Sequence, residues 1–192
     1  MAWETAGTPR ALARGFAWQL AKFLGWVALW WGALFVTVLL PVGAVVPMVV
    51  VLCVVAFNIL QSGGRLFLFR RMRRILRVYP WHRRAEAVRY DARGRKASFV
   101  LPDPDQPGKT ASPKASGLVF RPWDRIARRG FTGELWYAGD PRFACVIAEP
   151  GLKSPTYVAQ PTAYDRRTSP RRKGLSPEAR RRARAIGARV AD

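Results

Sequence analysis

The feature that most constrains this chain is an uncharged run of 42 residues, 23–64, most of it apolar. One helix of that length would extend about 63 Å, roughly twice the hydrocarbon thickness of a bilayer. The run must therefore turn back on itself. Pro41 and Pro47 mark the turn, because proline removes a backbone donor and breaks a helix. We expect a transmembrane helical hairpin over residues 17–61, with helices at 17–40 and 44–61.

A block of basic residues follows the apolar run. Residues 65–84 carry eight arginines and no acidic residue, and apolar side chains recur there with helical spacing. This pattern is typical of an amphipathic helix that lies among lipid headgroups. We expect a flexible joint at 62–64 and then a basic interfacial helix over 65–84. The predicted anionic-lipid contacts are Arg65, Arg70, Arg71, Arg73, Arg74, Arg77, Arg83 and Arg84. Two other interpretations stay open: these arginines only set topology, or they contact nucleic acid.

The charges also predict an orientation. Segment 1–16 and Lys22 contribute three basic residues before the apolar run, whereas the turn between the two predicted spans has none. Positive residues stay on the cytoplasmic side of a bilayer. We therefore expect a protein of the inner (plasma) membrane with two spans and with both termini in the cytoplasm.

Residues 85–160 change to the alternating pattern of short strands. One predicted hairpin covers 86–101, and a second covers 133–148 around the turn sequence Gly139-Asp140-Pro141. A polar excursion over 102–117, a strand at 117–121 and a last strand at 156–160 complete the prediction. We expect a small β-barrel-like or rolled-sheet domain, so the fold class is an α+β membrane protein. The predicted core is Val88, Phe99, Leu101, Val119, Leu135, Tyr137, Phe143, Cys145 and Ile147.

Residues 161–192 form a basic tail. Residues 165–192 hold ten basic and three acidic side chains, and Ser176-Pro177-Glu178 is a helix start signal. We expect a polar linker over 161–174 followed by a short helix that is marginal by itself. The tail binds lipid, nucleic acid or an acidic partner, or is only a solvated tail. Its candidate contacts are Arg171, Arg172, Lys173, Arg180, Arg181, Arg182 and Arg184.

Catalytic patterns are absent from the sequence. It contains one histidine, His82, and two distant cysteines, Cys53 and Cys145, with no nucleotide-binding, nucleophile-elbow or zinc-binding motif. The acidic residues Asp103, Asp105, Asp124, Glu134 and Asp140 stand in predicted turns, where carboxylates accept backbone hydrogen bonds. Trp123, Trp136 and Tyr137 are stacking candidates or core residues. We expect no enzyme activity, no metal and no cofactor.

Two segments carry a resemblance. The sequences RRILRVYPW, residues 73–81, and LWYAGDPRFACVIAEPG, residues 135–151, resemble uncharacterised two-span membrane proteins of high-GC actinobacteria. The resemblance covers about residues 15–160, and it implies a layout and no activity. The expected function is a cytoplasmic β interaction module held at the anionic leaflet by the Arg-rich helix. Nucleic-acid binding at the membrane, or a place in a transporter or oligomeric complex, is the alternative. The expected partners are anionic lipid, an unidentified protein, nucleic acid or a second copy of the chain.

Overall fold

The computed structural model describes residues 1–39, 41, 43, 45–90, 97–106, 108–115, 134–160, 163–169 and 172–191. The chain divides into two compact units. We call residues Ala13–Phe69 the hairpin unit. Residues Met1–Leu12 together with Arg70–Asp192 form the sheet unit. Each unit is described by itself.

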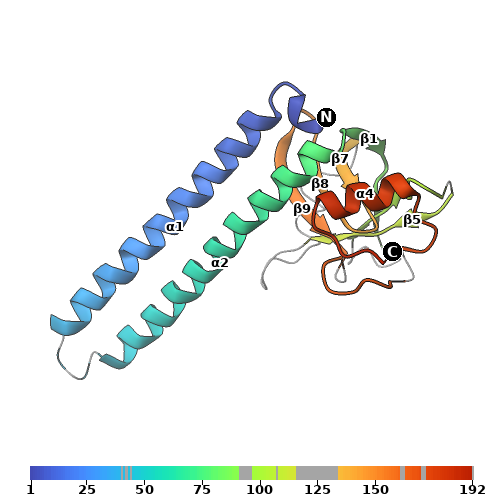
Figure 1. Cartoon of the computed structure of the whole chain (residues 1–192). Helices are drawn as coiled ribbons and strands as arrows, with labels where there is room; N and C mark the ends of the chain where they lie inside the picture. The colour runs from blue at the N-terminus through green and yellow to red at the C-terminus, as the bar shows by residue number, and fades with distance from the viewer. Residues whose placement is uncertain are drawn as a thin grey trace. The chain divides into compact units, whose positions relative to one another are not determined.

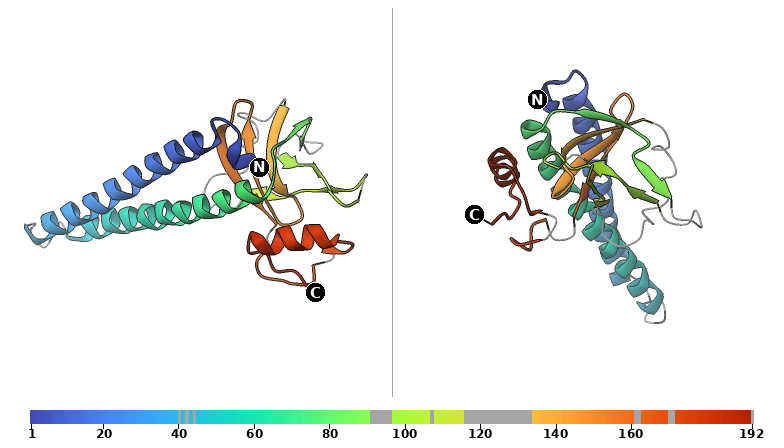
Figure 2. Two further views of the ribbon diagram at one scale, coloured as in Figure 1. Left: turned by 45° about the horizontal axis from the view of Figure 1, so that its top comes forward. Right: turned by 90° about the vertical axis from the view of Figure 1, so that its right-hand side faces the viewer.

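The hairpin unit is built from two long helices that lie side by side and antiparallel (Figures 1 and 2). Helix α1 spans Thr8–Leu39 and helix α2 spans Val45–Val78, so the predicted break at the prolines is confirmed. Phe16 of α1 and Phe69 of α2 pack edge to face with ring centroids 5.8 Å apart. Both helices are long and apolar enough to cross a membrane, as predicted.

The predicted joint at 62–64 is not formed. Helix α2 continues through Gly63 and Gly64 without interruption, and it ends only at Val78. A Cβ atom at Gly63 would lie 3.5 Å from the ring of Phe23, so this glycine gives α1 room to pack closely. Close helix packing, which favours small residues in membrane helices, explains the glycine better than flexibility does. The basic segment is therefore the last part of α2 and not a separate helix.

The apolar face of that basic segment is covered by protein. Met72, Ile75 and Leu76 are 3%, 0% and 1% exposed, and Tyr79 is 5% exposed. We predicted that this face lies against lipid, and the structure instead buries it. Residues 82–85, which we placed at the end of the helix, form a strand.

The sheet unit contains a five-stranded antiparallel sheet with the order β1-β7-β8-β9-β6. Two further antiparallel sheets have two strands each, β2 with β3 and β4 with β5. The strands of the main sheet are β1 (His82–Ala85), β6 (Lys114–Ala115), β7 (Glu134–Asp140), β8 (Ala144–Glu149) and β9 (Lys153–Ala159). The paired short strands are β2 (Val88–Tyr90), β3 (Ala97–Phe99), β4 (Leu101–Pro102) and β5 (Thr110–Ala111).

Both predicted hairpins are confirmed. Val88 pairs with Phe99 in the first, and Gly139 pairs with Cys145 in the second. The polar excursion over 102–117 differs from the prediction, because its described part contains β5 and β6. The sheets do not close into a barrel within the described residues. The predicted strand at 117–121, with Val119, lies outside the described residues, as do Trp123 and Asp124.

The core of the sheet unit matches the predicted residues closely. Its buried cluster consists of Ala87, Phe99, Leu101, Leu135, Tyr137, Cys145, Ile147 and Val158, and Val88 packs against it. Phe143 is also fully buried. Strand alternation identified these positions because inward-facing side chains recur with a period of two.

The two ends of the chain also belong to the sheet unit. The short helix η1 (Ala2–Glu4) is held by a backbone hydrogen bond from Ala2 to the Tyr79 carbonyl. Trp81 donates its indole N–H to the Thr8 hydroxyl at 3.1 Å. The first residues, which we predicted as a separate segment over 1–16, are therefore divided between the two units.

The C-terminal helix α4 (Pro177–Ala185) begins as predicted. The Ser176 side chain accepts a hydrogen bond from the Ala179 amide, with proline in the first turn. Ala179, Ala183 and Ile186 are 9%, 0% and 2% exposed, so the few apolar side chains along one side of this helix and at its end are buried in the protein. A short helix that is marginal by itself gains its stability from such packing.

Strands β7 and β8 approach each other closely at Gly139, so a substitution at this residue tests their contact. Gly139 has φ +128°, and an added Cβ would lie 2.4 Å from the Ala144 carbonyl oxygen. We expect Gly139→Ala to destabilise the protein by about 3 kcal/mol or more, through backbone strain plus overpacking. Gly151→Ala is the matched control, because Gly151 has φ +78° and open space around it. Thermal unfolding in detergent measures both variants, and equal losses would contradict this account of the β7–β8 contact.

Candidate functional site

A dense polar cluster in the sheet unit is centred on Arg142, in the turn between β7 and β8. Its side chain is 1% exposed, and it is the largest of the fully buried side chains among the described residues. The Nε atom donates to Asp140 Oδ1 at 3.0 Å, and Nη2 donates to Asp140 Oδ2 at 2.7 Å. Two nearly parallel hydrogen bonds of this kind fix the planes of both groups.

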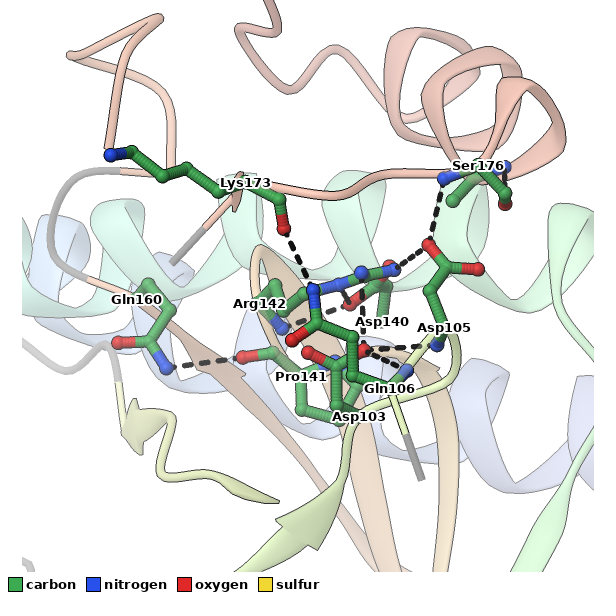
Figure 3. Close-up of polar contacts among 10 residues, drawn as sticks. Asp103, Asp105, Gln106, Asp140, Pro141, Arg142, Gln160, Lys173 and Ser176 are labelled. Carbon is green, nitrogen blue, oxygen red and sulfur yellow. Dashed lines mark hydrogen bonds and ion pairs between the residues drawn. The ribbon is translucent and has the colours of Figure 1, made fainter. Parts of the chain in front are cut away.

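Two further carboxylates converge on the same guanidinium (Figure 3). Asp105 accepts from Nη2 at 2.9 Å, and Asp103 Oδ1 lies 3.1 Å from Nη1 as an ion pair. Asp103 also accepts the backbone amides of Asp105 and Gln106, and Asp140 accepts the backbone amide of Arg142. The turn role that we predicted is confirmed for Asp103 and Asp140, whereas Asp105 accepts the backbone amide of the distant Ser176. The structure adds a cation that all three acids share.

The Arg142 cluster also holds the start of α4. Asp105 Oδ2 accepts the backbone amide of Ser176 at 3.0 Å, and Gln106 donates to the Lys173 carbonyl at 3.1 Å (Figure 3). On another side of the turn, Gln160 donates to the Pro141 carbonyl at 3.1 Å. The cluster therefore connects the β7–β8 turn, the 103–106 turn and the C-terminal helix.

Burial and charge shift the titration of this cluster. Desolvation lowers the pKa of Arg142, but its bonds and charge interactions with Asp140, Asp105 and Asp103 outweigh desolvation and raise that pKa above the ordinary value. Desolvation also raises the pKa of Asp105, but hydrogen bonds from Ser176 and Arg142 outweigh it and hold that pKa below the ordinary value. The guanidinium and the Asp105 carboxylate are therefore charged at neutral pH.

A cleft of ≈ 370 Å³ adjoins this cluster. Its walls include Tyr79, His82, Asp105, Tyr137, Asp140 and Glu178. The His82 and Tyr137 rings lie 5.4 Å apart, and the guanidinium of Arg182 lies 6.0 Å from the centroid of the Tyr79 ring. Burial raises the pKa of Tyr79 and of Tyr137, so both hydroxyls stay protonated at neutral pH.

The arginines predicted to contact lipid fall into three places. Arg65 lies in the hairpin unit and donates to Gln61. Arg83 and Arg84 are exposed on β1, where the Arg83 guanidinium lies 4.4 Å from the centroid of the Trp136 ring. The others are exposed on the end of α2, in the sheet unit: Arg70, Arg71, Arg73, Arg74 and Arg77.

The candidate contacts of the tail are also divided. Arg172 is 6% exposed and donates to the backbone carbonyls of Arg166 and Arg189, which gives it a structural place. Arg182 pairs with Glu178, and Lys173 is exposed. Arg171 lies outside the described residues. A shallow depression of ≈ 400 Å³ is lined by Pro177, Arg180, Arg181 and Arg184.

The remaining reactive groups are few. Cys145 is fully buried, and desolvation raises the pKa of its thiol, whereas Cys53 is exposed in the hairpin unit. The described residues contain no group of three His, Cys, Asp or Glu side chains placed to hold a metal ion. The candidate functional site therefore consists of the Arg142 cluster and the adjoining cleft.

No protein-family model, curated protein or solved structure matches the chain. The resemblance to actinobacterial two-span proteins accordingly stays a prediction. Sequence reasoning identified the three acids and placed them in turns, but it missed Arg142. Its local signal is a basic residue between the acid of a Gly-Asp-Pro turn and the apolar run 143–148, which indicates burial of the side chain but not its distant partners.

Removal of Arg142 tests its structural role. We expect Arg142→Met to destabilise the sheet unit by roughly 3–5 kcal/mol, because three carboxylates lose a buried cation. The control Arg180→Met changes an exposed arginine of α4, and a change within about 0.5 kcal/mol is expected. Near-ultraviolet circular dichroism during thermal unfolding measures both variants. Wild-type stability of Arg142→Met would show that the cluster contributes nothing to the fold.

Proposed function

We propose that this chain is an integral membrane protein that presents the sheet unit as an interaction module at an anionic leaflet. The supporting observation is the apolar surface of the hairpin unit. Trp31, Phe35 and Leu60 are 68%, 69% and 72% exposed. Soluble proteins rarely expose contiguous apolar patches larger than a few hundred Å². A lipid bilayer would cover these side chains.

The charge distribution supports the location and the orientation in this proposal. The turn between the helices carries no basic residue, and residues 65–84 carry eight arginines. The positive-inside rule then favours the inner (plasma) membrane with both termini in the cytoplasm. In this orientation the sheet unit meets cytoplasmic partners.

Electrostatic attraction, rather than apolar insertion, is the proposed contact with the leaflet. Met72, Ile75 and Leu76 are buried, while Arg70, Arg73 and other arginines on the same part of α2 are exposed. An arginine near an anionic surface contributes about 1 kcal/mol before screening. Gln61 is the predicted end of the second span, and Arg70 follows it by nine residues. Nine residues reach at most about 32 Å when fully extended, so Arg70 lies no farther than this from the end of the span. The proposed module includes no catalytic activity, and its protein partner is unidentified.

Energy transfer to lipid tests the proposed contact. The full chain carries Cys53→Ser and a donor dye on Thr168→Cys, because Thr168 is exposed and the buried Cys145 thiol does not react. Nanodiscs contain phosphatidylcholine with or without phosphatidylglycerol, and an acceptor dye marks the headgroups. We expect phosphatidylglycerol to increase the transfer and salt to reverse the increase, because salt screens exposed charges.

A matched pair of variants assigns the effect to α2. Glutamine at Arg70, Arg73, Arg74 and Arg77 should abolish the increase with phosphatidylglycerol. Glutamine at Arg180, Arg181 and Arg184 should preserve it. Transfer that is independent of lipid charge in the wild-type protein would overturn the electrostatic part of the proposal.

A second candidate function is binding of nucleic acid by the tail. The observation in its favour is the depression on α4, where three arginines surround one concave surface. Guanidinium groups bind phosphate oxygens in pairs of hydrogen bonds, and such contacts release condensed counterions. This function would place nucleic acid beside the membrane.

The salt dependence of oligonucleotide binding tests this candidate. If Arg180, Arg181 and Arg184 each neutralise a phosphate, their replacement by glutamine lowers the slope of log K against log salt by about 2 for a single strand. Fluorescence anisotropy of a labelled oligonucleotide with the full chain in nanodiscs measures this slope. If the four α2 substitutions lower this slope by the same amount and the α4 substitutions do not, nucleic acid binds at the end of α2 and not at the tail.

A further inference from the structure

The cleft beside the Arg142 cluster has the size of a small-molecule site. Its volume of ≈ 370 Å³ falls within the range of ligand pockets, roughly 300–1,000 Å³. It lies within the sheet unit, between α4, the residues that follow α2, and β7. Secondary-structure elements, rather than loops alone, therefore supply its walls.

One wall contains a buried hydroxyl with no partner. Tyr79 is 5% exposed, and its hydroxyl has no hydrogen-bond partner among the described residues. A buried polar group left in this state costs about 1–3 kcal/mol. A ligand that donates a hydrogen bond to the Tyr79 oxygen would recover part of that cost.

The charge of the cleft is opposite to that of the chain. Asp105, Asp140 and Glu178 line it, and Arg182 is the lining cation among the described residues. Behind this wall, Arg142 is shared by Asp103, Asp105 and Asp140. These three acids and Glu178 carry four negative charges, of which Arg142 and Arg182 balance two. A local acidic surface in a protein of net charge +21 favours a cationic ligand.

The aromatic side chains of the cleft suit the same ligand chemistry. The face of Tyr79 already has a guanidinium near it, that of Arg182 at 6.0 Å, and the same guanidinium pairs with Glu178. Cations are attracted to the faces of aromatic rings within about 6 Å. Tyr137, Asp105 and Glu178 line the same cleft, so a ring and carboxylates are available there to a ligand's guanidinium or ammonium group.

We propose that this cleft binds a small organic cation with a guanidinium or primary ammonium group. The carboxylates of Asp105 and Glu178 accept its N–H groups, the Tyr79 oxygen accepts another, and the Tyr79 and Tyr137 rings contact the cation. The cation is either a free small molecule or the side chain of a basic peptide. This site is independent of the arginine surfaces discussed above.

Paired probes of equal shape test the charge requirement. The full chain in phosphatidylcholine nanodiscs is titrated by calorimetry with butylguanidinium and with butylurea, its neutral counterpart. We expect butylguanidinium to bind at least about tenfold more tightly, because only the cation interacts with the carboxylates and the ring faces. Acetyl-Gly-Arg-Gly-amide forms a second arm, and tighter binding of the peptide than of butylguanidinium assigns the cation to a peptide side chain. Equal binding of butylguanidinium and butylurea, or the absence of binding by both butylguanidinium and the peptide, overturns the proposal.

Two substitutions place the probe in the cleft. Tyr79→Phe removes the unpaired hydroxyl, so it should weaken butylguanidinium binding about fivefold while the melting temperature stays equal or rises. Glu178→Gln changes a side chain that is 68% exposed, and a similar loss of affinity is expected. Arg180→Gln, on the same helix but outside the cleft, should leave binding unchanged. If neither Tyr79→Phe nor Glu178→Gln weakens binding, the probe does not occupy this cleft.

Discussion

The buried guanidinium of Arg142 is the contact on which the sheet unit depends most. It bonds to Asp140 in its own turn and reaches Asp103 and Asp105, which lie 37 or more residues away. Burial of these charges carries a large desolvation cost, and only good geometry offsets that cost. The bidentate contact with Asp140 supplies such geometry. The network therefore fixes one arrangement of three chain segments, because any other arrangement would leave a buried charge unpaired.

The position of the C-terminal helix follows from the same network. Asp105 accepts both Arg142 Nη2 and the Ser176 amide, so the carboxylate that balances the guanidinium also holds the start of α4. With that end of the helix fixed, Glu178, Ala179 and Arg182 form one wall of the cleft. The acidic character of the cleft has the same origin, because three carboxylates gather around one arginine. A tail of strongly basic composition thus becomes part of an acidic site.

The sequence predicted those helix boundaries that are determined by residues close by in the chain. Pro41 stands between α1 and α2, Pro47 lies in the first turn of α2, and Ser176-Pro177 begins α4. Backbone chemistry within a few residues decides these boundaries. The Gly63-Gly64 pair misled the prediction, since helix packing against Phe23 outweighed the low helix propensity of glycine. Arg142 could not be predicted as the centre of a site, because two of its three partners come from a distant turn. Its role depends on tertiary contacts that no local pattern encodes.

The end of α2 shows why a helical pattern of apolar and basic residues does not identify the surface it meets. Periodicity requires only that Met72, Ile75 and Leu76 leave water, and either lipid or protein satisfies that requirement. Here protein covers them, and the arginines between them remain exposed. Because the apolar face at this end of α2 is already buried in protein, contact with a membrane can add no hydrophobic stabilisation there. Any attraction of this surface to a leaflet must then come from charge alone, which makes it reversible by salt in a way that the apolar hairpin is not.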